Sequence, residues 1–204
     1  MTAVRTDVIN TALIELGQPV SVGVDTDTRQ AVVSIRNLYE RRAKFMLGNY
    51  PWNFARKVVR LTSPSGTPVG WDYKFNKPPN CLRICRVTNR ERQDRAPDIP
   101  YEEREGLIYT NSEETWLAYV DGVYATNDSG GWPEPAVQAL GFDLANLVAP
   151  GLDRSAVQRD ELKKDARRAL RDAQLWDAQQ NKVERPPLSA WQRNHISGRH
   201  GENG

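Results

Sequence analysis

The hydrophobic pattern of this 204-residue chain changes its period twice, and this change constrains the fold more than any single motif. Apolar residues recur every three or four positions over residues 1–56 and again over residues 132–182, which is typical of amphipathic helices. Between them, residues 57–131 carry short β-branched and aromatic runs separated by proline and glycine, a pattern typical of strands and turns. The sequence therefore predicts an α+β protein with a small β-domain inserted into a helical frame.

The first region contains two predicted helices joined by a polar turn. Gly17 and Pro19 follow the first helix, as glycine and proline often do at a C-terminus. Asp27 lies three residues before Gln30, which predicts a start for the second helix resembling a capping box, and Pro51 ends it. The apolar stripe of the first helix is Val4, Val8, Ala12 and Leu16. We expect these two helices to pack antiparallel.

The middle region is predicted to form strands over residues 57–61, 71–75, 82–87, 106–110 and 116–120. Clusters of glycine and proline separate these runs, so the connections are turns and not helices. A single small antiparallel sheet that packs on the helical frame is the expected result.

Two further helices are predicted between Trp132 and Gln180. The first ends at the Pro150–Gly151 pair, and Ser155 with Gln158 forms a capping box for the second. The expected inner stripe of the last helix is Leu162, Ala166, Ala169, Ala173 and Trp176. Residues 132–182 would then complete an antiparallel bundle of about four helices with the helix pair of residues 1–56.

The last segment, residues 183–204, has no periodicity and is predicted to be an extended tail. Leu188, Trp191 and Ile196 are its large apolar residues, which is what a docking segment needs. An inert terminus is the alternative interpretation.

Composition excludes several classes of protein. Lysine and arginine total 28 against 26 acidic residues, so neither a strongly basic nucleic-acid binder nor an acidic solvating protein is expected. Apolar residues make up only 39% of the chain, which predicts a lean core or a surface completed by partners. No membrane helix is predicted because the longest apolar stretch, residues 136–149, contains polar and charged residues. The N-terminus has no apolar signal region, so we expect a soluble protein made in a reducing compartment.

Few residues suggest chemistry. Cys81, Cys85, His195 and His200 match the internal spacings of a zinc site, but the cysteines lie in a predicted strand, where residues four apart are separated by about 13 Å. We expect buried structural thiols and no metal or other cofactor. Both histidines lie in the predicted tail, so no serine or cysteine has a base partner on the folded body. The glutamates at residues 102–105 and 113–114 are interpreted as solvated turns, and no catalytic residue or enzyme activity is expected.

One cluster of arginines suggests nucleic-acid binding. Arginine clusters can hold phosphates, but Glu91 and Asp94 interrupt this one. The cluster could contact DNA or a neighbouring subunit, or it could be a charged loop that faces solvent. Its members are Arg83, Arg86, Arg90, Arg92 and Arg95.

The order of several short motifs suggests a family. The series runs from YPWNFA at residues 50–55 through YKF at 73–75 and PPNCLRI at 78–84 to EGLI at 105–108, WLAYV at 116–120 and the Trp132–Pro133 pair. Over about residues 1–180 this series resembles the head-to-tail adaptor (tail tubular protein A) family of short-tailed bacteriophages.

The resemblance implies a non-enzymatic structural protein of the virion, synthesised in the bacterial host cytoplasm and not bound to a membrane. Family members form a twelve-fold ring below the portal protein, extend the DNA channel with transient, sequence-independent contact with DNA, and give a platform to a distal tail or nozzle protein. The tail residues that would dock on the portal are Pro186, Pro187, Leu188, Trp191 and Arg193. The alternative is a monomeric nucleic-acid-binding regulator that uses the segment from Arg83 to Arg95.

Overall fold

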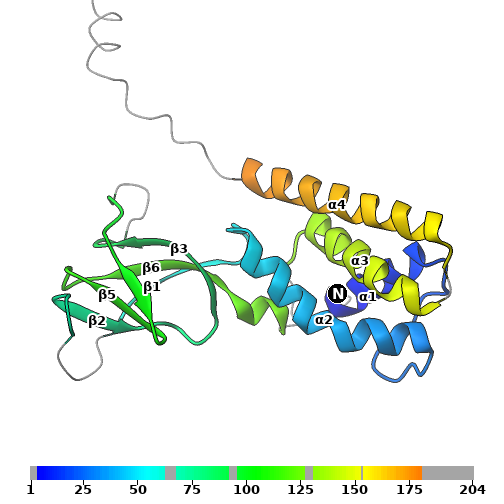
Figure 1. Cartoon of the computed structure of the whole chain (residues 1–204), viewed down its shortest axis with the longest axis horizontal. Helices are drawn as coiled ribbons and strands as arrows, with labels where there is room; N and C mark the ends of the chain where they lie inside the picture. Colours follow the sequence, from blue (N-terminus) through cyan, green and yellow to red (C-terminus); the bar gives the residue numbers. More distant parts are fainter. Residues whose placement is uncertain (1–3, 63–67, 92–95, 127–130, 153, 181–204) are drawn as a thin grey trace, which may run out of the picture.

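The computed structural model describes residues 4–62, 68–91, 96–126, 131–152 and 154–180, and these form two lobes. Helices α1 (Val4–Glu15), α2 (Gln30–Asn49), α3 (Glu134–Val148) and α4 (Ala156–Gln179) make up the helical lobe. The strands lie together at the other end of the molecule, as Figure 1 shows. The predicted α+β class is confirmed, and each of the four predicted helices is present.

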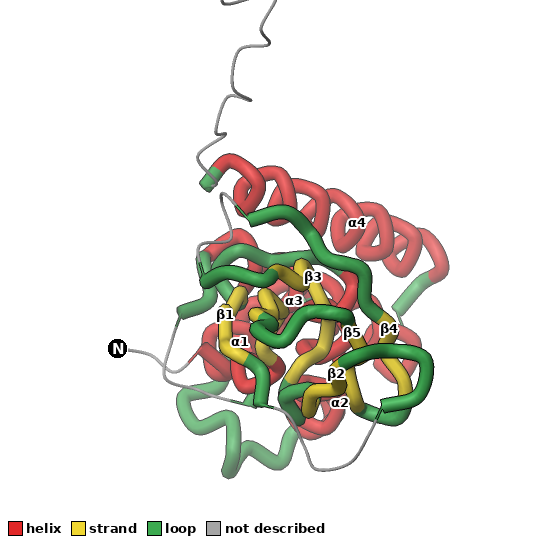
Figure 2. The backbone as a smooth tube through the Cα atoms, turned by 90° about the vertical axis from the view of Figure 1, so that its left-hand side faces the viewer, coloured by secondary structure: helices red, strands yellow, loops and turns green. Residues whose placement is uncertain are grey.

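Helix α3 is the centre of the helical lobe and packs against α1, α2 and α4. It is buried around most of its circumference, which explains why its sequence is the most apolar of the helices. At Gly141 a side chain would place its Cβ 2.6 Å from Cγ2 of Thr11, so only glycine lets α1 and α3 approach this closely. Helix α4 lies along the outside of the lobe in both views (Figures 1 and 2).

The β lobe contains two three-stranded antiparallel sheets where the sequence predicted one. The first sheet has the order β1-β6-β3 and the second β2-β5-β4. Their bounds are β1 Arg56–Arg60, β2 Tyr73–Asn76, β3 Cys81–Thr88, β4 Glu102–Arg104, β5 Leu107–Thr110 and β6 Trp116–Asp121. Phe75 and Ile108 from one sheet and Val87, Leu117 and Tyr119 from the other form one small core.

Strand β4 corrects the prediction that its glutamates lie in a turn. Glu102 and Glu103 are exposed in β4, which pairs with β5 at the sheet edge. No local pattern indicates this strand, because β4 has no alternation of polar and apolar residues. Local side-chain contacts support it instead: the Arg104 guanidinium lies 4.7 Å from the centre of the Tyr109 ring, and Glu103 forms an ion pair with Lys77.

The segment YPWNFA connects α2 to β1 along the chain, and its aromatic residues form a chain of contacts within the helical core. Trp52 is fully buried, and its indole Nε1 donates a hydrogen bond of 2.9 Å to the Met46 carbonyl. Its ring packs against Tyr50 at 4.8 Å and Phe54 at 5.5 Å between ring centres. Phe54 continues the chain to Trp132 at 5.4 Å, and so the segment ties α2 to the entry of α3.

The C-terminal end of α4 corrects the predicted inner stripe. Trp176 is 37% exposed, while the next residue, Asp177, is only 1% exposed. The Asp177 carboxylate accepts hydrogen bonds from the backbone N–H groups of Asn53 at 2.9 Å and Phe54 at 3.3 Å. Because these two N–H groups need an acceptor, a carboxylate occupies the position where the helical period predicts an apolar residue.

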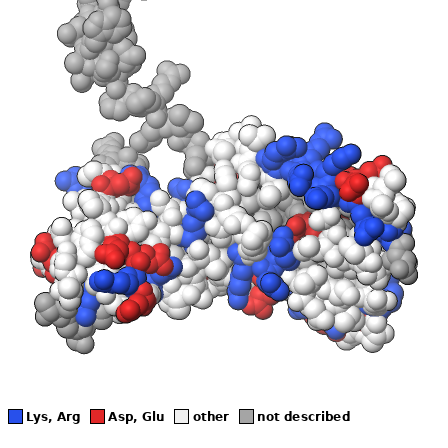
Figure 3. All heavy atoms as spheres, viewed as in Figure 1, with Lys and Arg blue, Asp and Glu red and all other residues white. Residues whose placement is uncertain are grey.

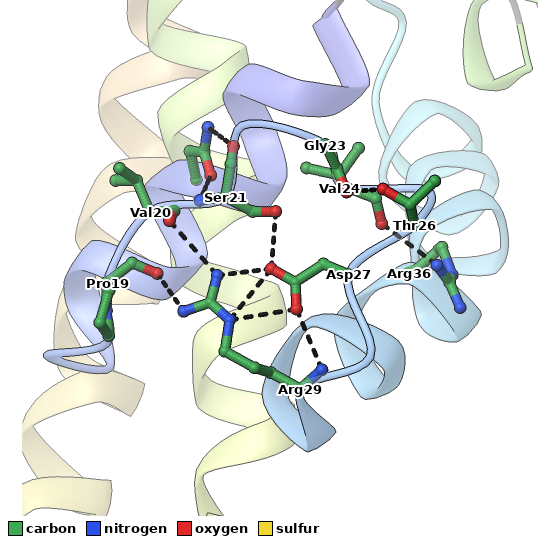
Figure 4. Close-up of polar contacts among 10 residues, drawn as sticks. Pro19, Val20, Ser21, Gly23, Val24, Thr26, Asp27, Arg29 and Arg36 are labelled. Atoms are coloured by element: carbon green, nitrogen blue, oxygen red, sulfur yellow. Dashed lines mark hydrogen bonds and ion pairs between the residues drawn. The ribbon is translucent and has the colours of Figure 1, made fainter.

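The start of α4 follows the prediction, and the start of α2 does not. The Ser155 and Gln158 side chains form the predicted capping box. The N-cap residue of α2 is Arg29, and Asp27 does not cap the helix through Gln30. As Figure 4 shows, Asp27 instead accepts hydrogen bonds from the Arg29 guanidinium and the Ser21 hydroxyl.

Candidate interaction surfaces

The arginine cluster that the sequence singled out does not form one free basic patch in the described part of the chain. Arg86 on β3 forms an ion pair of 2.7 Å with Asp98 and donates to the Ala96 carbonyl at 3.0 Å. Arg83 donates to the Gly48 carbonyl at 3.3 Å, which links β3 to α2. Arg90 is exposed at the end of the strand. Arg86 and Arg83 are therefore both engaged by other groups of the same chain.

The remaining predicted site residues lie outside the described residues. They are Arg92 and Arg95 of the arginine cluster, and Pro186, Pro187, Leu188, Trp191 and Arg193 of the predicted docking tail. Their proposed roles stay predictions.

The two cysteines lie on β3 without a disulfide between them. Cys81 is buried and Cys85 is half-buried. Burial raises the pKa of the Cys81 thiol to about 11 and also raises that of Cys85, so both thiols are protonated at neutral pH. Within the described ranges, no three histidine, cysteine or acidic side chains lie close enough to hold a metal ion. His195 and His200 lie outside those ranges.

A basic groove between α2, α3 and α4 is the first of two charged surfaces that the sequence did not predict. It encloses a cavity of about 210 Å³, and among the described residues it is lined by three cations, Arg42, Lys163 and Arg167, and one carboxylate, Asp143. On the face drawn in Figure 3, lysines and arginines gather over α4 and α2.

Arg42 is held rigidly in this basic groove. Its guanidinium makes a bidentate ion pair with Asp143 of α3, with N–O distances of 2.8 and 2.9 Å, and it lies 4.4 Å from the centre of the Phe45 ring. Lys163 and Arg167 are exposed one turn apart on α4. No carboxylate of the described residues lies within ion-pair distance of either. Their charges are therefore available to a partner.

An acidic flank on the other side of α4 is the second surface. It consists of the carboxylates that line two neighbouring hollows along α1, α3 and α4: Glu15, Glu161, Asp165 and Asp172. The two cations beside them are already engaged, since Arg168 pairs with Asp172 at 3.9 Å and Arg154 donates to the Leu16 carbonyl. Burial, together with the nearby charge of Asp165, raises the pKa of Glu15.

Sequence reasoning missed these surfaces because it considered only charge pairs along α4. Opposite charges at helical spacing predict ion pairs on its outer face between Asp160 and Lys164, Asp165 and Arg168, and Arg168 and Asp172, and the last of these pairs is present. The same spacing places Lys163 and Arg167 together on one side of the helix. Finding the groove also required Arg42, which lies more than a hundred residues away in the sequence. Only the contact between helices brings these side chains together.

The loop between α1 and α2 is a third surface, at the end of the helical lobe away from the sheets (Figure 1). It exposes Val22 completely and Val20 by 54%. The Arg29 guanidinium holds the loop by donating to the carbonyls of Pro19 at 2.7 Å and Val20 at 3.3 Å (Figure 4). Hydrogen bonds from Arg29 and Ser21 lower the pKa of Asp27 well below the ordinary range of a carboxyl group. The exposed apolar tip is therefore carried by a fixed polar scaffold.

The comparisons with known proteins do not indicate a function, so the functional inference rests on the sequence and the geometry. No protein-family model and no curated protein matches this chain. None of the described helices is both long and apolar enough to cross a membrane.

Proposed function

We propose that this protein is a head-to-tail adaptor of a short-tailed bacteriophage, a structural component of the virion without enzymatic activity. In this proposal the four helices form an antiparallel bundle and copies of it pack side by side in a ring below the portal protein. The β lobe faces the distal tail or nozzle protein, and viral DNA passes through the central channel. The chain is synthesised in the bacterial host cytoplasm before assembly.

The observation that carries the proposal is the two-ended shape of the molecule. An adaptor needs separate surfaces for the component above it and the component below it. Here the sheets lie at one end, and the scaffolded loop with exposed Val20 and Val22 lies at the other. The core of the helical lobe extends to Val120 of β6, and Arg83 of β3 donates a hydrogen bond to the Gly48 carbonyl of α2, so the two lobes are in direct contact. The motif series resembling the adaptor family agrees with this arrangement.

Residues 183–204 supply the portal contact in this proposal. Proline and aromatic residues suit docking into a groove of a partner, because proline already restricts the backbone and less conformational entropy is lost on binding. Deleting residues 184–204 is then expected to leave a folded chain that no longer joins portal rings.

The test is negative-stain imaging of the chain mixed with purified portal rings of the same virus. The proposal requires an additional layer on one face of the ring. Bare portal rings beside free chains, at concentrations well above micromolar, would contradict it. Salt-sensitive binding of the free chain to duplex DNA in the same preparation would then favour the nucleic-acid-binding regulator instead.

A further inference from the structure

Helix α4 separates two surfaces of opposite charge. The basic groove lies on the side of α4 that faces α2, and the acidic flank lies on the side that faces α1. The separation follows from helical spacing: Lys163 and Arg167 are four residues apart, as are Glu161 and Asp165, and the two pairs are offset by two positions. An offset of two residues rotates a side chain by about 200° around the helix, so the pairs project to opposite sides.

Each surface has charge that the described residues leave unneutralised. In the basic groove, Asp143 is engaged by Arg42, which leaves Lys163 and Arg167. On the acidic flank, Arg168 engages Asp172, which leaves Glu15, Glu161 and Asp165. Burial is the main cause of the raised pKa of Glu15, and the nearby charge of Asp165 raises it further. Both surfaces would gain from a partner of opposite charge.

Each surface also presents one large apolar side chain. Phe45 is 54% exposed at the basic groove, and Ile14 is 59% exposed on the acidic flank. A polar surface with a large apolar anchor is a common arrangement in protein–protein interfaces. The two surfaces are thus complementary in charge and similar in their apolar content.

We propose that the partner is a second copy of this chain, and that the basic groove of one copy binds the acidic flank of the next. The basic groove cannot face itself, because Lys163 and Arg167 would meet like charges, and the same holds for the acidic flank. The contact is therefore heterologous, and a heterologous contact that closes on itself generates a ring. This inference rests on the proposed function and supplies its lateral subunit contact.

The test uses two charge-reversed variants. The first is Lys163→Glu with Arg167→Glu, and the second is Glu161→Lys with Asp165→Lys. Alone, each variant juxtaposes like charges and is expected to raise the Kd of self-association by about a hundredfold. Sedimentation velocity over a range of concentrations at low salt measures this, with the full-length chain as reference.

An equimolar mixture of the two variants is the decisive sample. The altered groove of the first variant is now acidic and fits the altered flank of the second, which is basic. The unaltered groove of the second variant fits the unaltered flank of the first. Copies that alternate therefore restore every contact, and we expect the mixture to assemble like the original protein. A groove that binds DNA or another protein would not regain its partner by mixing.

Two single variants control for a general effect of charge. Lys164→Glu alters α4 beside the basic groove without lining it, and Glu113→Lys alters an exposed residue of the β lobe. Both should assemble like the original chain. Thermal unfolding followed by circular dichroism verifies that each variant is folded.

The outcomes separate this inference from the proposed function. If the charge-reversed variants self-associate as the original chain does, or if the mixture fails to assemble, the inference is wrong; the layer on portal rings still decides the function. If the mixture rescues assembly but the original chain adds no layer to portal rings, the inference stands and the adaptor proposal falls. An original chain that neither self-associates nor forms a layer would overturn both.

Discussion

The helical lobe and the β lobe of this protein are held together in different ways. The helical lobe has a continuous core that includes every helix and extends through Trp52 to Val120 of β6. The β lobe has a much smaller core between its two sheets, and ion pairs such as that between Arg60 and Glu114 lie exposed on its surface. Exposed pairs of this kind contribute little stability, so the small core and the main-chain pairing of the strands support the β lobe.

This difference determines how firmly the geometry of a surface is fixed in each lobe. In the helical lobe, close packing fixes the relative positions of α2, α3 and α4, and thereby the distance between charges that are far apart in the sequence. In the β lobe, loops extend from a thin framework and can vary at low cost to the fold. Under the proposed adaptor function, we therefore expect contacts between copies to use the helices and contacts with a tail protein to use the sheets and their loops.

The strongest expected contrast is between two tryptophans. Trp52→Ala removes a fully buried ring from the helical core and should reduce the free energy of unfolding by about 3–5 kcal/mol. Trp71→Ala removes a half-buried ring whose exposed hydrogen bond to Glu102 is 2.9 Å long, and should cost less than about 1 kcal/mol. Urea unfolding measures both. Equal losses would show that the two lobes depend on their aromatic residues alike.

The next largest effect concerns the link between α4 and the aromatic segment. Asp177→Ala leaves the backbone N–H groups of Asn53 and Phe54 without their acceptor and should cost about 2–3 kcal/mol. Asp177→Asn keeps one acceptor oxygen and should cost less. The matched control is Asp160→Ala at an exposed position of the same helix. A loss at Asp177 no larger than that at Asp160 would mean that the buried carboxylate does not hold the segment.

A smaller effect is expected where α1 and α3 meet. Gly141→Ala places a Cβ within 2.7 Å of two Thr11 side-chain atoms and should cost about 1–3 kcal/mol because the helices must separate. Gly151→Ala is the control, since no atom lies within 4 Å of its added Cβ. Thermal unfolding of both variants measures the difference. An unchanged Tm for Gly141→Ala would argue against close packing at this contact.

The smallest effect appears only in acid and concerns the scaffold of the α1–α2 loop. The pKa of Asp27 is lower in the folded state than in the unfolded chain. The ionised carboxylate therefore contributes its full stabilisation of the folded state above the unfolded pKa of about 4, and this contribution is lost as the pH falls through the folded pKa. Asp27→Asn should therefore flatten the decline in stability below about pH 4. Urea unfolding at a series of pH values tests this. An unchanged acid profile would show that other carboxylates determine the decline.

The structure also shows how far each kind of sequence signal extends. All five predicted strands are present with bounds shifted by no more than two residues, because β-branched runs between turns are a local signal. The capping box of Ser155 is local too, and it was predicted correctly. Asp27 matched the same pattern in part, but the Arg29 guanidinium competes for its carboxylate. A capping motif thus predicts the cap reliably only where no other side chain binds the capping group more strongly.

By itself, the sequence determined the α+β class, the four helices and the positions of the predicted strands, since each depends on periodicity or turn residues within a short stretch. Tertiary structure alone decided the division into two sheets, the burial of Asp177 and the gathering of Arg42 with Lys163 and Arg167. These features depend on contacts between residues far apart in the chain, for which one sequence carries no local signal. The charge surfaces beside α4 belong to this second group, because the way the helices pack defines each surface.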